Sequence, residues 1–293
     1  IQGCMDEIAV NFTSLIDDLE SDVNTDDGSC LYSSQIYDDI TELNDQLEED
    51  LSVFETVDEE QDYSMSFDGV DDYVYILDNS SYNFGTSDFS ISGWLKTNDS
   101  SGVILSNCKG SGQSNPNNNS WYIIYIEDGK LAFEFTDGYS SPGDYVSCLS
   151  NEIVNDNNWH YFTVTFDRSE FGSIYLDGLY SSSSYIGDYG GSISPNDTIN
   201  IGYDTNHMSY FLDGEISNIQ TWNIALSSSQ IQSYMICPPT VTQYGLVGFL
   251  NFNEGVGDTV YDLSGNGNHG IINGATFTED VPESYDGCTD QNA

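Results

Sequence analysis

Short runs in which apolar and polar residues alternate recur along the chain from Ser64 onward, separated by clusters of Gly, Asn, Asp and Ser. The clearest runs are Tyr73 to Ile76, Phe89 to Trp94, Tyr122 to Ile126, Leu131 to Phe135, Tyr161 to Phe166 and Ser173 to Leu176. A period of two with frequent turn signals is typical of antiparallel sandwiches. Asp128-Gly129 and Asp177-Gly178 favour tight hairpins, whose two central positions need positive φ. One short helix is expected, from Ser227 to Met235, within an otherwise all-β fold of two antiparallel sheets.

Residues 31–62 follow a different period. Their apolar positions are spaced by three or four with acidic residues between them: Ile36, Ile40, Leu43, Leu47, Leu51 and Phe54. The stretch contains no Gly or Pro, so the pattern predicts an acidic amphipathic helix. Its apolar stripe needs a partner, which is either the sandwich of the same chain or a helix of a neighbouring copy.

Charge narrows the classes of partner. The 293 residues include 49 Asp and Glu but only 4 Lys and Arg, which gives a formal net charge of −45. Phosphate binding needs clustered cations, so nucleic acid and anionic membrane surfaces are excluded as partners. No apolar run reaches transmembrane length, so insertion into a membrane is not expected. So many carboxylates also repel one another. This repulsion favours either a salty medium or bound divalent cations, which take oxygen ligands from Asp and Glu.

The cysteines indicate an oxidising compartment. There are six, with wide spacings and no CxxC pair, which argues against a zinc site. They are Cys4, Cys30, Cys108, Cys148, Cys237 and Cys288. An even number in a chain rich in Tyr, Asn, Ser and Gly suggests disulfides and a secreted or cell-surface protein.

Eight segments match a known family in order over residues 64–236. They are Ser66 to Val74, Phe89 to Lys96, Asp128 to Leu131, Trp159 to Val164, Ile174 to Gly178, Ile199 to Gly202, Phe211 to Ile216 and Thr221 to Ser227. Together they resemble the LamG-like domain (laminin G, or concanavalin A-like lectin/glucanase). The segments Leu246 to Gly255 and Asp262 to Gly270 resemble a strand and loop that commonly flank such domains. This resemblance implies a jelly-roll sandwich over residues 63–280.

Both ends carry a second resemblance. The segment 1–30 begins with Gly3-Cys4 and ends with Asp27-Gly28-Ser29-Cys30, and the segment 281–293 contains Gly287-Cys288. Both are similar to short Cys-bounded repeats of secreted bacterial surface proteins. This resemblance suggests one unit of a tandem array, or a subunit whose tail meets the head of the next copy. The hypothesised disulfides are Cys4–Cys30, Cys108–Cys148 and Cys237–Cys288, although Cys288 would pair downstream if an array continued.

Candidate chemistry is confined to metal binding. The resemblance implies a Ca²⁺ ion near the Asp68-Gly69 turn, with Asp68, Asp71 and Asp213 as ligands. Alternatively, Asp68 and Asp213 only cap turns through their side chains. The carboxylate motif ExDxxE of laminarinases is absent from the strand segments, so no catalysis is expected. His160, next to Trp159, is expected to be structural rather than catalytic.

The sequence therefore predicts a non-catalytic extracellular module for adhesion or assembly, which is a repeat or subunit of a surface fibre or large adhesin. Its partners would be copies of itself, extracellular glycans or proteins. The alternative is a carbohydrate-binding lectin domain of a secreted enzyme or surface protein, and a third option is a filament subunit without a ligand. Loop tyrosines suit either sugar or protein contacts; they are Tyr139, Tyr145, Tyr185, Tyr189, Tyr203 and Tyr210.

Overall fold

The structure is a computed structural model in which a compact unit begins at Gln61. The described residues are 61–77, 80–107, 120–138, 145–193, 198–204, 210–241 and 243–283. The predicted Cys-bounded segment 1–30, nearly all of the predicted helix 31–62 and the tail beyond residue 283 lie outside them.

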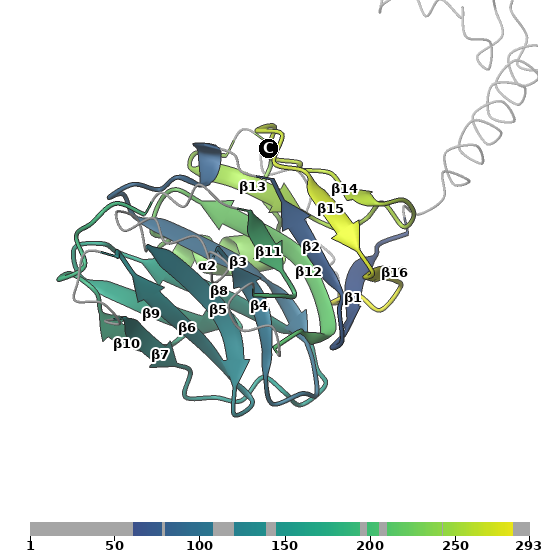
Figure 1. Cartoon of the computed structure of the whole chain (residues 1–293), viewed down its shortest axis with the longest axis horizontal. Coiled ribbons are helices and arrows are strands. Elements are labelled where there is room, and N and C mark those ends of the chain that lie inside the picture. The colour runs from purple at the N-terminus through teal and green to yellow at the C-terminus, as the bar shows by residue number, and fades with distance from the viewer. Residues whose placement is uncertain are drawn as a thin grey trace, which may run out of the picture. The chain divides into compact units, whose positions relative to one another are not determined.

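Two antiparallel sheets form a sandwich, as the alternating runs predicted (Figure 1). The first, here named the helix-side sheet, runs in the order β10 (Leu179–Tyr185), β9 (Phe171–Leu176), β8 (His160–Phe166), β3 (Phe89–Lys96), β12 (Asp213–Trp222), β1 (Ser64–Asp68) and β16 (Thr276–Thr278), with β13 (Leu246–Leu250) also paired to β12. The second, named the open sheet, runs in the order β14 (Thr259–Val260), β15 (Gly270–Asn273), β2 (Tyr73–Ile76), β11 (Ile199–Ile201), β4 (Gly102–Ser106), β5 (Trp121–Glu127), β6 (Lys130–Thr136) and β7 (Val146–Leu149). A 3-10 turn, η1 (Ser80–Tyr82), precedes β3.

The main core lies between the sheets and is unusually rich in phenylalanine. Phe89 stacks on Phe84 and Phe166 with ring centroids 4.4 and 4.3 Å apart, and Phe133 meets Phe166 edge to face at 5.2 Å. All four rings are buried. Each such ring removes a large apolar area from water, so this cluster carries much of the stability of the sandwich.

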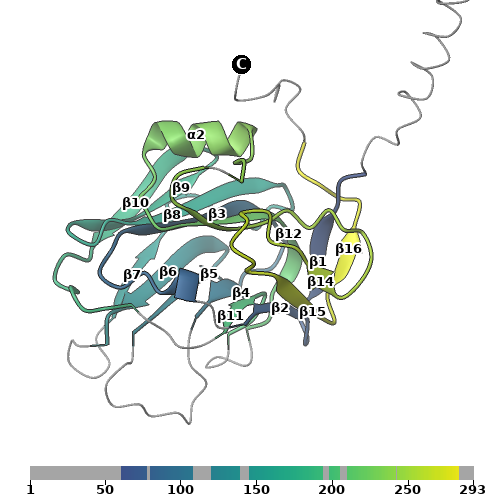
Figure 2. The same cartoon turned by 90° about the horizontal axis from the view of Figure 1, so that it is seen from above.

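One helix, α2 (Ser228–Ile236), covers the outer face of the helix-side sheet (Figure 2). Ser227 caps it, because its hydroxyl accepts from the backbone of Gln230 while the Gln230 side chain accepts from the backbone of Ser227. This is a capping box, and it confirms the predicted helix to within a residue. On its inner side, Tyr234 stacks on buried Trp222 at 4.5 Å. No helix among the described residues is long and apolar enough to span a membrane.

Two hairpins follow the predicted turn chemistry. Asp128 and Gly129 join β5 to β6 with φ values of 51° and 75°, and Asp177 and Gly178 join β9 to β10 with the same values. Positive φ at both positions is the geometry that keeps the twist of the two strands continuous. The first hairpin is important for the site because it places Asp128 at the rim of the open sheet.

The lateral edges β7 and β10 are joined by serine hydroxyls rather than by a backbone ladder. Ser182 on β10 donates to the carbonyl of Leu149 at 2.6 Å, and Ser184 donates to the carbonyl of Ser147 at 2.8 Å. Outward carbonyls of β7 that would otherwise face solvent therefore have partners. The two sheets are thus linked along this side of the sandwich.

Candidate functional site

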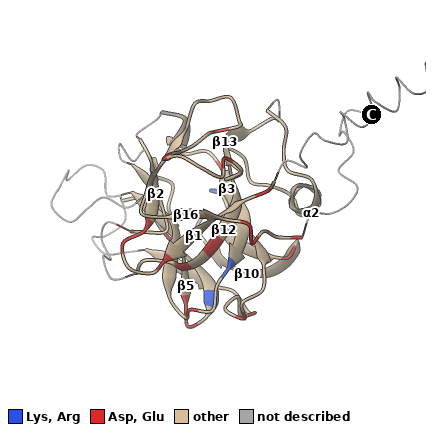
Figure 3. Ribbon diagram, turned by 90° about the vertical axis from the view of Figure 1, so that its right-hand side faces the viewer, with Lys and Arg blue, Asp and Glu red and all other residues tan. Residues whose placement is uncertain are grey.

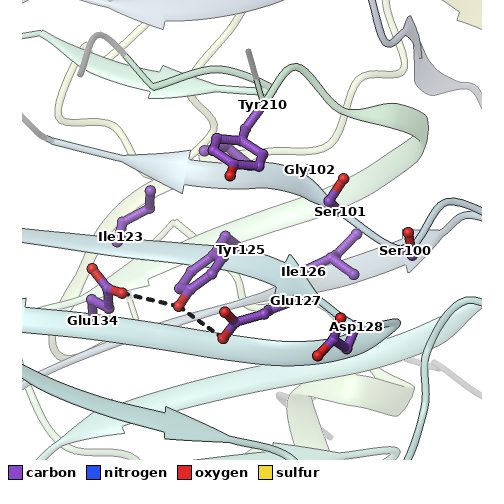
Figure 4. A pocket seen from close by; sticks show the side chains of 11 residues that line it. Ser100, Ser101, Gly102, Ile123, Tyr125, Ile126, Glu127, Asp128, Glu134 and Tyr210 are labelled. Atoms are coloured by element: carbon purple, nitrogen blue, oxygen red, sulfur yellow. Dashed lines mark hydrogen bonds between the residues drawn. The ribbon is translucent and has the colours of Figure 1, made fainter. Parts of the chain in front are cut away.

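The outer face of the open sheet carries a cavity of about 330 Å³, here named the Tyr125 pocket (Figure 4). Tyr125 of β5 and Glu134 of β6 lie on its floor, and Tyr210, just before β12, stands over it. The backbone of Val103 donates to the carbonyl of Tyr210 at 3.1 Å, which ties this tyrosine to the start of β4. Glu127 lines the end of the cavity. Strands β4, β5 and β6 and the segment just before β12 therefore build one site.

The alternation of β5 explains why these side chains face outward. Tyr122, Ile124 and Ile126 point into the core between the sheets. The other face of the strand presents Tyr125 and Glu127 on the outside, as the period of two requires. Aromatic and acidic groups are thus placed side by side on a surface that no described helix covers.

The hydroxyl of Tyr125 lies between two carboxylates. It is 3.1 Å from Oε1 of Glu134 and 3.3 Å from Oε2 of Glu127. Burial raises the pKa of Tyr125 far above its ordinary value, and the negative charges of Glu134 and Glu127 raise this pKa further. The phenol therefore stays protonated at any physiological pH and acts as a donor to these carboxylates.

More aromatic side chains extend the same face beyond the pocket. Tyr203 stacks on Phe211 at 4.7 Å and contacts Tyr73 at 5.4 Å, and Trp121 contacts Tyr145 at 6.0 Å. Of the tyrosines singled out from the sequence, Tyr145 and Tyr203 thus belong to this face, Tyr210 belongs to the pocket, and Tyr185 is exposed on β10 of the other sheet. Tyr189 packs against the core, and Tyr139 lies outside the described residues.

Sequence reasoning missed Tyr125 and Glu134, the two residues at the centre of the pocket. Tyr125 was included in a predicted strand without a role. The available signal was the spacing of Trp121, Tyr125 and Glu127 on one face of that strand, since large aromatic and charged residues on an outward face indicate a surface with a partner.

The predicted metal residues are only partly brought together. Ligand atoms of Asp68, Asp71 and Asp72 lie within 4.8 Å of one another, and Asp72 is the buried member. Asp213 pairs with Asp68 across β1 and β12 but is not part of this group. An added Cβ on Gly69 would lie 2.9 Å from the Cβ of Asp213, so glycine permits the close approach of the two strands here.

Asp68 also makes the turn contact that was the alternative interpretation for Asp68 and Asp213, and Asp72 makes a further backbone contact. Asp68 Oδ1 accepts from the backbone of Val70 at 2.9 Å, and Asp72 Oδ2 accepts from the backbone of Asp68 at 3.0 Å. Burial raises the pKa of Asp72, and the charges of Asp68 and Asp71 raise this pKa too. Three neighbouring carboxylates that destabilise one another's charge form a donor set that suits Ca²⁺.

The cysteine predictions require one correction. Cys148 carries a free thiol, so the predicted Cys108–Cys148 disulfide is wrong in this structure. The physical reason is the direction of the side chain: Cys148 belongs to the buried core, and its Sγ lies 3.4 Å from Oγ of Ser182 on β10. Cys237 is disulfide-bonded. Its predicted partner Cys288 lies outside the described residues, as do Cys4, Cys30 and Cys108.

His160 is held by carboxylates at the start of β8. Its Nδ1 lies 3.0 Å from Asp177 and its Nε2 lies 3.1 Å from Asp156. The hydrogen bond that the imidazole donates to Asp177 is the main cause that raises the pKa of His160. Asp177 also accepts from the backbone of Tyr161 at 2.9 Å. The imidazole thus fastens the β9–β10 hairpin to β8, a structural arrangement like the one expected.

Comparisons with known proteins agree with the sandwich. A family model described as the concanavalin A-like lectin/glucanases superfamily matches residues 68–232. A solved structure of a candidate carbohydrate binding protein from Bacteroides ovatus is similar at 16% identity with a TM-score of 0.56, and the match covers 74% of this chain and 59% of that one. A heptameric SAP-like pentraxin from Limulus polyphemus is similar at 18% identity with a TM-score of 0.52, over 75% of this chain and 95% of that one. No curated protein matches the sequence significantly.

Proposed function

Since the chain belongs to the concanavalin A-like lectin/glucanases superfamily, we propose that it is a non-catalytic extracellular binding module that holds a carbohydrate in the Tyr125 pocket. The observation that carries the proposal is the pairing of aromatic faces, Tyr125 and Tyr210, with the acceptor oxygens of Glu127 and Glu134 around one cavity. Sugar rings pack on aromatic faces and offer hydroxyl donors to such acceptors. The similarity to a candidate carbohydrate binding protein supports the same class of ligand.

Secretion is supported by the disulfide-bonded state of Cys237, because such bonds persist in oxidising compartments. The acidic surface also limits the choice of ligand. Figure 3 shows acidic residues at many points of the sandwich and few basic ones. Sialylated or sulfated glycans would be repelled by this field, so the proposed ligands are neutral or cationic saccharides.

The test is an oligosaccharide panel measured by isothermal titration calorimetry. Loss of a stacking ring from Tyr125→Ala is expected to weaken binding at least about tenfold, an effect of the size of one aromatic contact. Tyr180→Ala is the matched control, because Tyr180 is 59% exposed on β10 of the other sheet. Equal affinities of the two variants, or no saccharide bound at all, would refute the proposal. New reducing ends in the same samples would refute the non-catalytic part, since Glu127 and Glu134 flank one hydroxyl.

We further propose that Asp68, Asp71 and Asp72 hold a structural Ca²⁺ ion. Burial is the main cause that raises the pKa of Asp72, and a divalent cation would relieve the added repulsion from Asp68 and Asp71. Adding Ca²⁺ to chelator-treated protein is expected to raise the melting temperature by several degrees, about 1–2 kcal/mol of linkage at moderate excess of ligand. Asp72→Asn keeps an acceptor for the backbone of Asp68 but removes one charge, so it should shrink the Ca²⁺ response without lowering stability in chelator. An unchanged Ca²⁺ response in this variant would contradict the site.

A role in a fibre or large adhesin remains a prediction from the resemblance at Gly3-Cys4 and Gly287-Cys288. Both segments lie outside the described residues. Sedimentation of the full chain with Ca²⁺, compared with a variant that begins at Gln61, tests it. Concentration-dependent association that requires residues 1–60 would support self-assembly, and a chain that stays monomeric would count against it.

A further inference from the structure

A second hollow lies on the opposite side of the sandwich from the Tyr125 pocket. It consists of a cavity of about 390 Å³ and an adjoining one of about 310 Å³, and Trp94 and Glu283 line both. Trp94 belongs to β3 and packs against the apolar cluster of Tyr161 and Trp222 beneath α2. Figure 2 shows α2 on the other side of the sandwich from the open sheet. The two cavities together are here named the Trp94 groove.

A β-bulge in β12 shapes the groove. Neighbouring side chains of a regular strand point to opposite faces, yet Ser217 and Asn218 both line the second cavity. The register between β12 and β3 shifts after Ser217, and Asn218 has a φ of 52°. Ile216 and Ile219, on either side, belong to the main core. A bulge changes the direction of a side chain, and this one brings Asn218 to the outer face.

Asn157 has the same unusual conformation in the first cavity, with a φ of 63°. Its backbone N–H donates to the carbonyl of Thr97 at 2.9 Å, which joins the loop before β8 to the end of β3. Asparagine tolerates positive φ better than most residues with a side chain. The amides of Asn157 and Asn218 take part in no hydrogen bond among the described residues. Each cavity therefore contains a neutral amide that is available both to donate and to accept.

The two tryptophans of the groove are held in place by their neighbours. Nε1 of Trp159 donates to Oδ1 of Asp280 at 3.0 Å, and the other oxygen of Asp280 pairs with Lys96. The ring of Trp94 contacts that of Tyr161 at 5.3 Å. Both indoles are nevertheless partly exposed and line the first cavity. Rings that are already oriented lose less entropy when a ligand packs on them.

A neutral saccharide matches this combination of groups. Indole faces suit the apolar side of a sugar ring, and amides suit hydroxyl groups, which also both donate and accept. An anionic ligand gains little, because Lys96 is already paired with Asp280 and the net charge of the chain is −45. A peptide strand cannot extend the sheet beneath the groove, because β3 is paired on both sides, with β8 and β12. Each cavity reaches the volume at which ligand pockets begin.

We propose that the Trp94 groove is a second saccharide site, which binds neighbouring rings of a neutral oligosaccharide through Trp94, Trp159, Asn157 and Asn218. The proposal goes beyond the proposed function, because this site is built from other residues and lies across the sandwich from the Tyr125 pocket. One chain then holds two glycan strands at once. Sites that face opposite ways cross-link polysaccharides, because a single short strand cannot reach both.

The test is calorimetry of the full chain with a panel of neutral gluco-, manno-, galacto- and xylo-oligosaccharides. The original chain is expected to show two sites across the panel, and Tyr125→Ala should weaken one and leave the other unchanged. In the Tyr125→Ala background, Trp159→Ala should weaken the remaining site at least about tenfold, as for the loss of a central indole. Tyr180→Ala is the matched control, because it removes an exposed ring of the same sheet that lines neither site.

Asn218→Gly separates binding from stability, since Trp159→Ala also removes a hydrogen bond to Asp280. Glycine adopts positive φ freely, so Asn218→Gly should melt at about the same temperature as the original chain. Loss of one amide should still weaken binding in the groove about three- to tenfold. An unchanged affinity in this variant would overturn the proposed site.

The remaining results distinguish the two sites. If Tyr125→Ala removes all saccharide binding, the groove proposal is overturned while the proposed function stands. If Trp159→Ala removes all binding and Tyr125→Ala removes none, the groove is supported and the proposed function of the Tyr125 pocket fails. Binding of no saccharide overturns both. A proline-rich peptide that binds in place of saccharides, with the same dependence on Asn218, overturns the ligand class.

Precipitation of a neutral polysaccharide tests the cross-linking role. The original chain should precipitate it, whereas Tyr125→Ala and Trp159→Ala should each bind without precipitating it, because each retains one site. If both variants precipitate the polysaccharide as well as the original chain does, the cross-linking role is overturned.

Discussion

Replacing Arg168 tests how a strongly acidic chain uses one of its few cations. Arg168 follows β8 and is 6% exposed. Its guanidinium donates to the carbonyls of Gly85, Tyr189 and Gly191 at 3.1, 2.7 and 2.6 Å, and it lies 4.9 Å from the ring centroid of Phe135. One side chain therefore joins two loops that are distant in sequence to the edge of the core.

The expected loss follows from these contacts. Hydrogen bonds from a charged donor contribute about 1.5 kcal/mol or more each, and the ring contact adds about 0.5–1 kcal/mol. The carbonyl of Gly85 also accepts from the backbone of Ile193 at 2.7 Å, so it keeps one hydrogen-bond partner when Arg168 is replaced. Arg168→Met is therefore expected to lower the free energy of unfolding by about 3–4 kcal/mol. Arg168→Lys should lose about 2 kcal/mol, because one ammonium cannot replace the planar fork.

Urea unfolding followed by tryptophan fluorescence measures these free energies. An unchanged slope of the free energy of unfolding against urea concentration is the criterion that two-state unfolding is preserved. Lys130→Met is the matched control, because it makes the same change in net charge without removing a hydrogen bond that the described residues show. If Arg168→Met lost less than about 1 kcal/mol relative to Lys130→Met, the contacts would carry little energy and the reasoning would be refuted.

Two further predictions concern single titratable groups. The pKa of His160 is raised, chiefly by Asp177. Its contribution to the free energy of unfolding should therefore be complete below about pH 6.5 and should disappear as the pH rises through the folded pKa. If the free energy of unfolding of His160→Asn fell as steeply with rising pH as that of the original chain, this prediction would be contradicted. Cys148 should resist alkylation in the native state and react fully on unfolding without a reductant, because it is free and 6% exposed. Peptide mapping that finds it linked to another cysteine would show that the buried thiol was wrongly assigned.

Strand positions could be predicted from the sequence because alternation is a local signal. The run Tyr73–Ile76 is β2, and the Asp128-Gly129 turn lies where its residue types require positive φ. The capped helix after Ser227 is equally local. The conformation of each of these elements is determined by residues that are close together in the sequence.

The site depended on long-range pairing and could not be predicted in the same way. Tyr125 and Tyr210 line one cavity only because the segment before β12 is hydrogen-bonded to the start of β4. Asp71 and Asp72 are neighbours of identical type, and only the register of β2 decides that Asp72 is the buried one. Cys148 was paired by proximity in sequence, whereas the inward face of β7 determines its actual surroundings.

The serine contacts between β7 and β10 have a consequence for behaviour in concentrated salt. At low ionic strength the net charge of −45 keeps copies of the chain apart, but at about 1 M salt the screening length falls to about 3 Å and this protection is lost. Unpaired strand edges then become templates for aggregation. Because the carbonyls of Ser147 and Leu149 already accept from Ser184 and Ser182, this side of the sandwich offers a blunted edge. Protection of this edge from pairing with another chain therefore comes from local hydrogen bonds, which salt screens far less than it screens net charge.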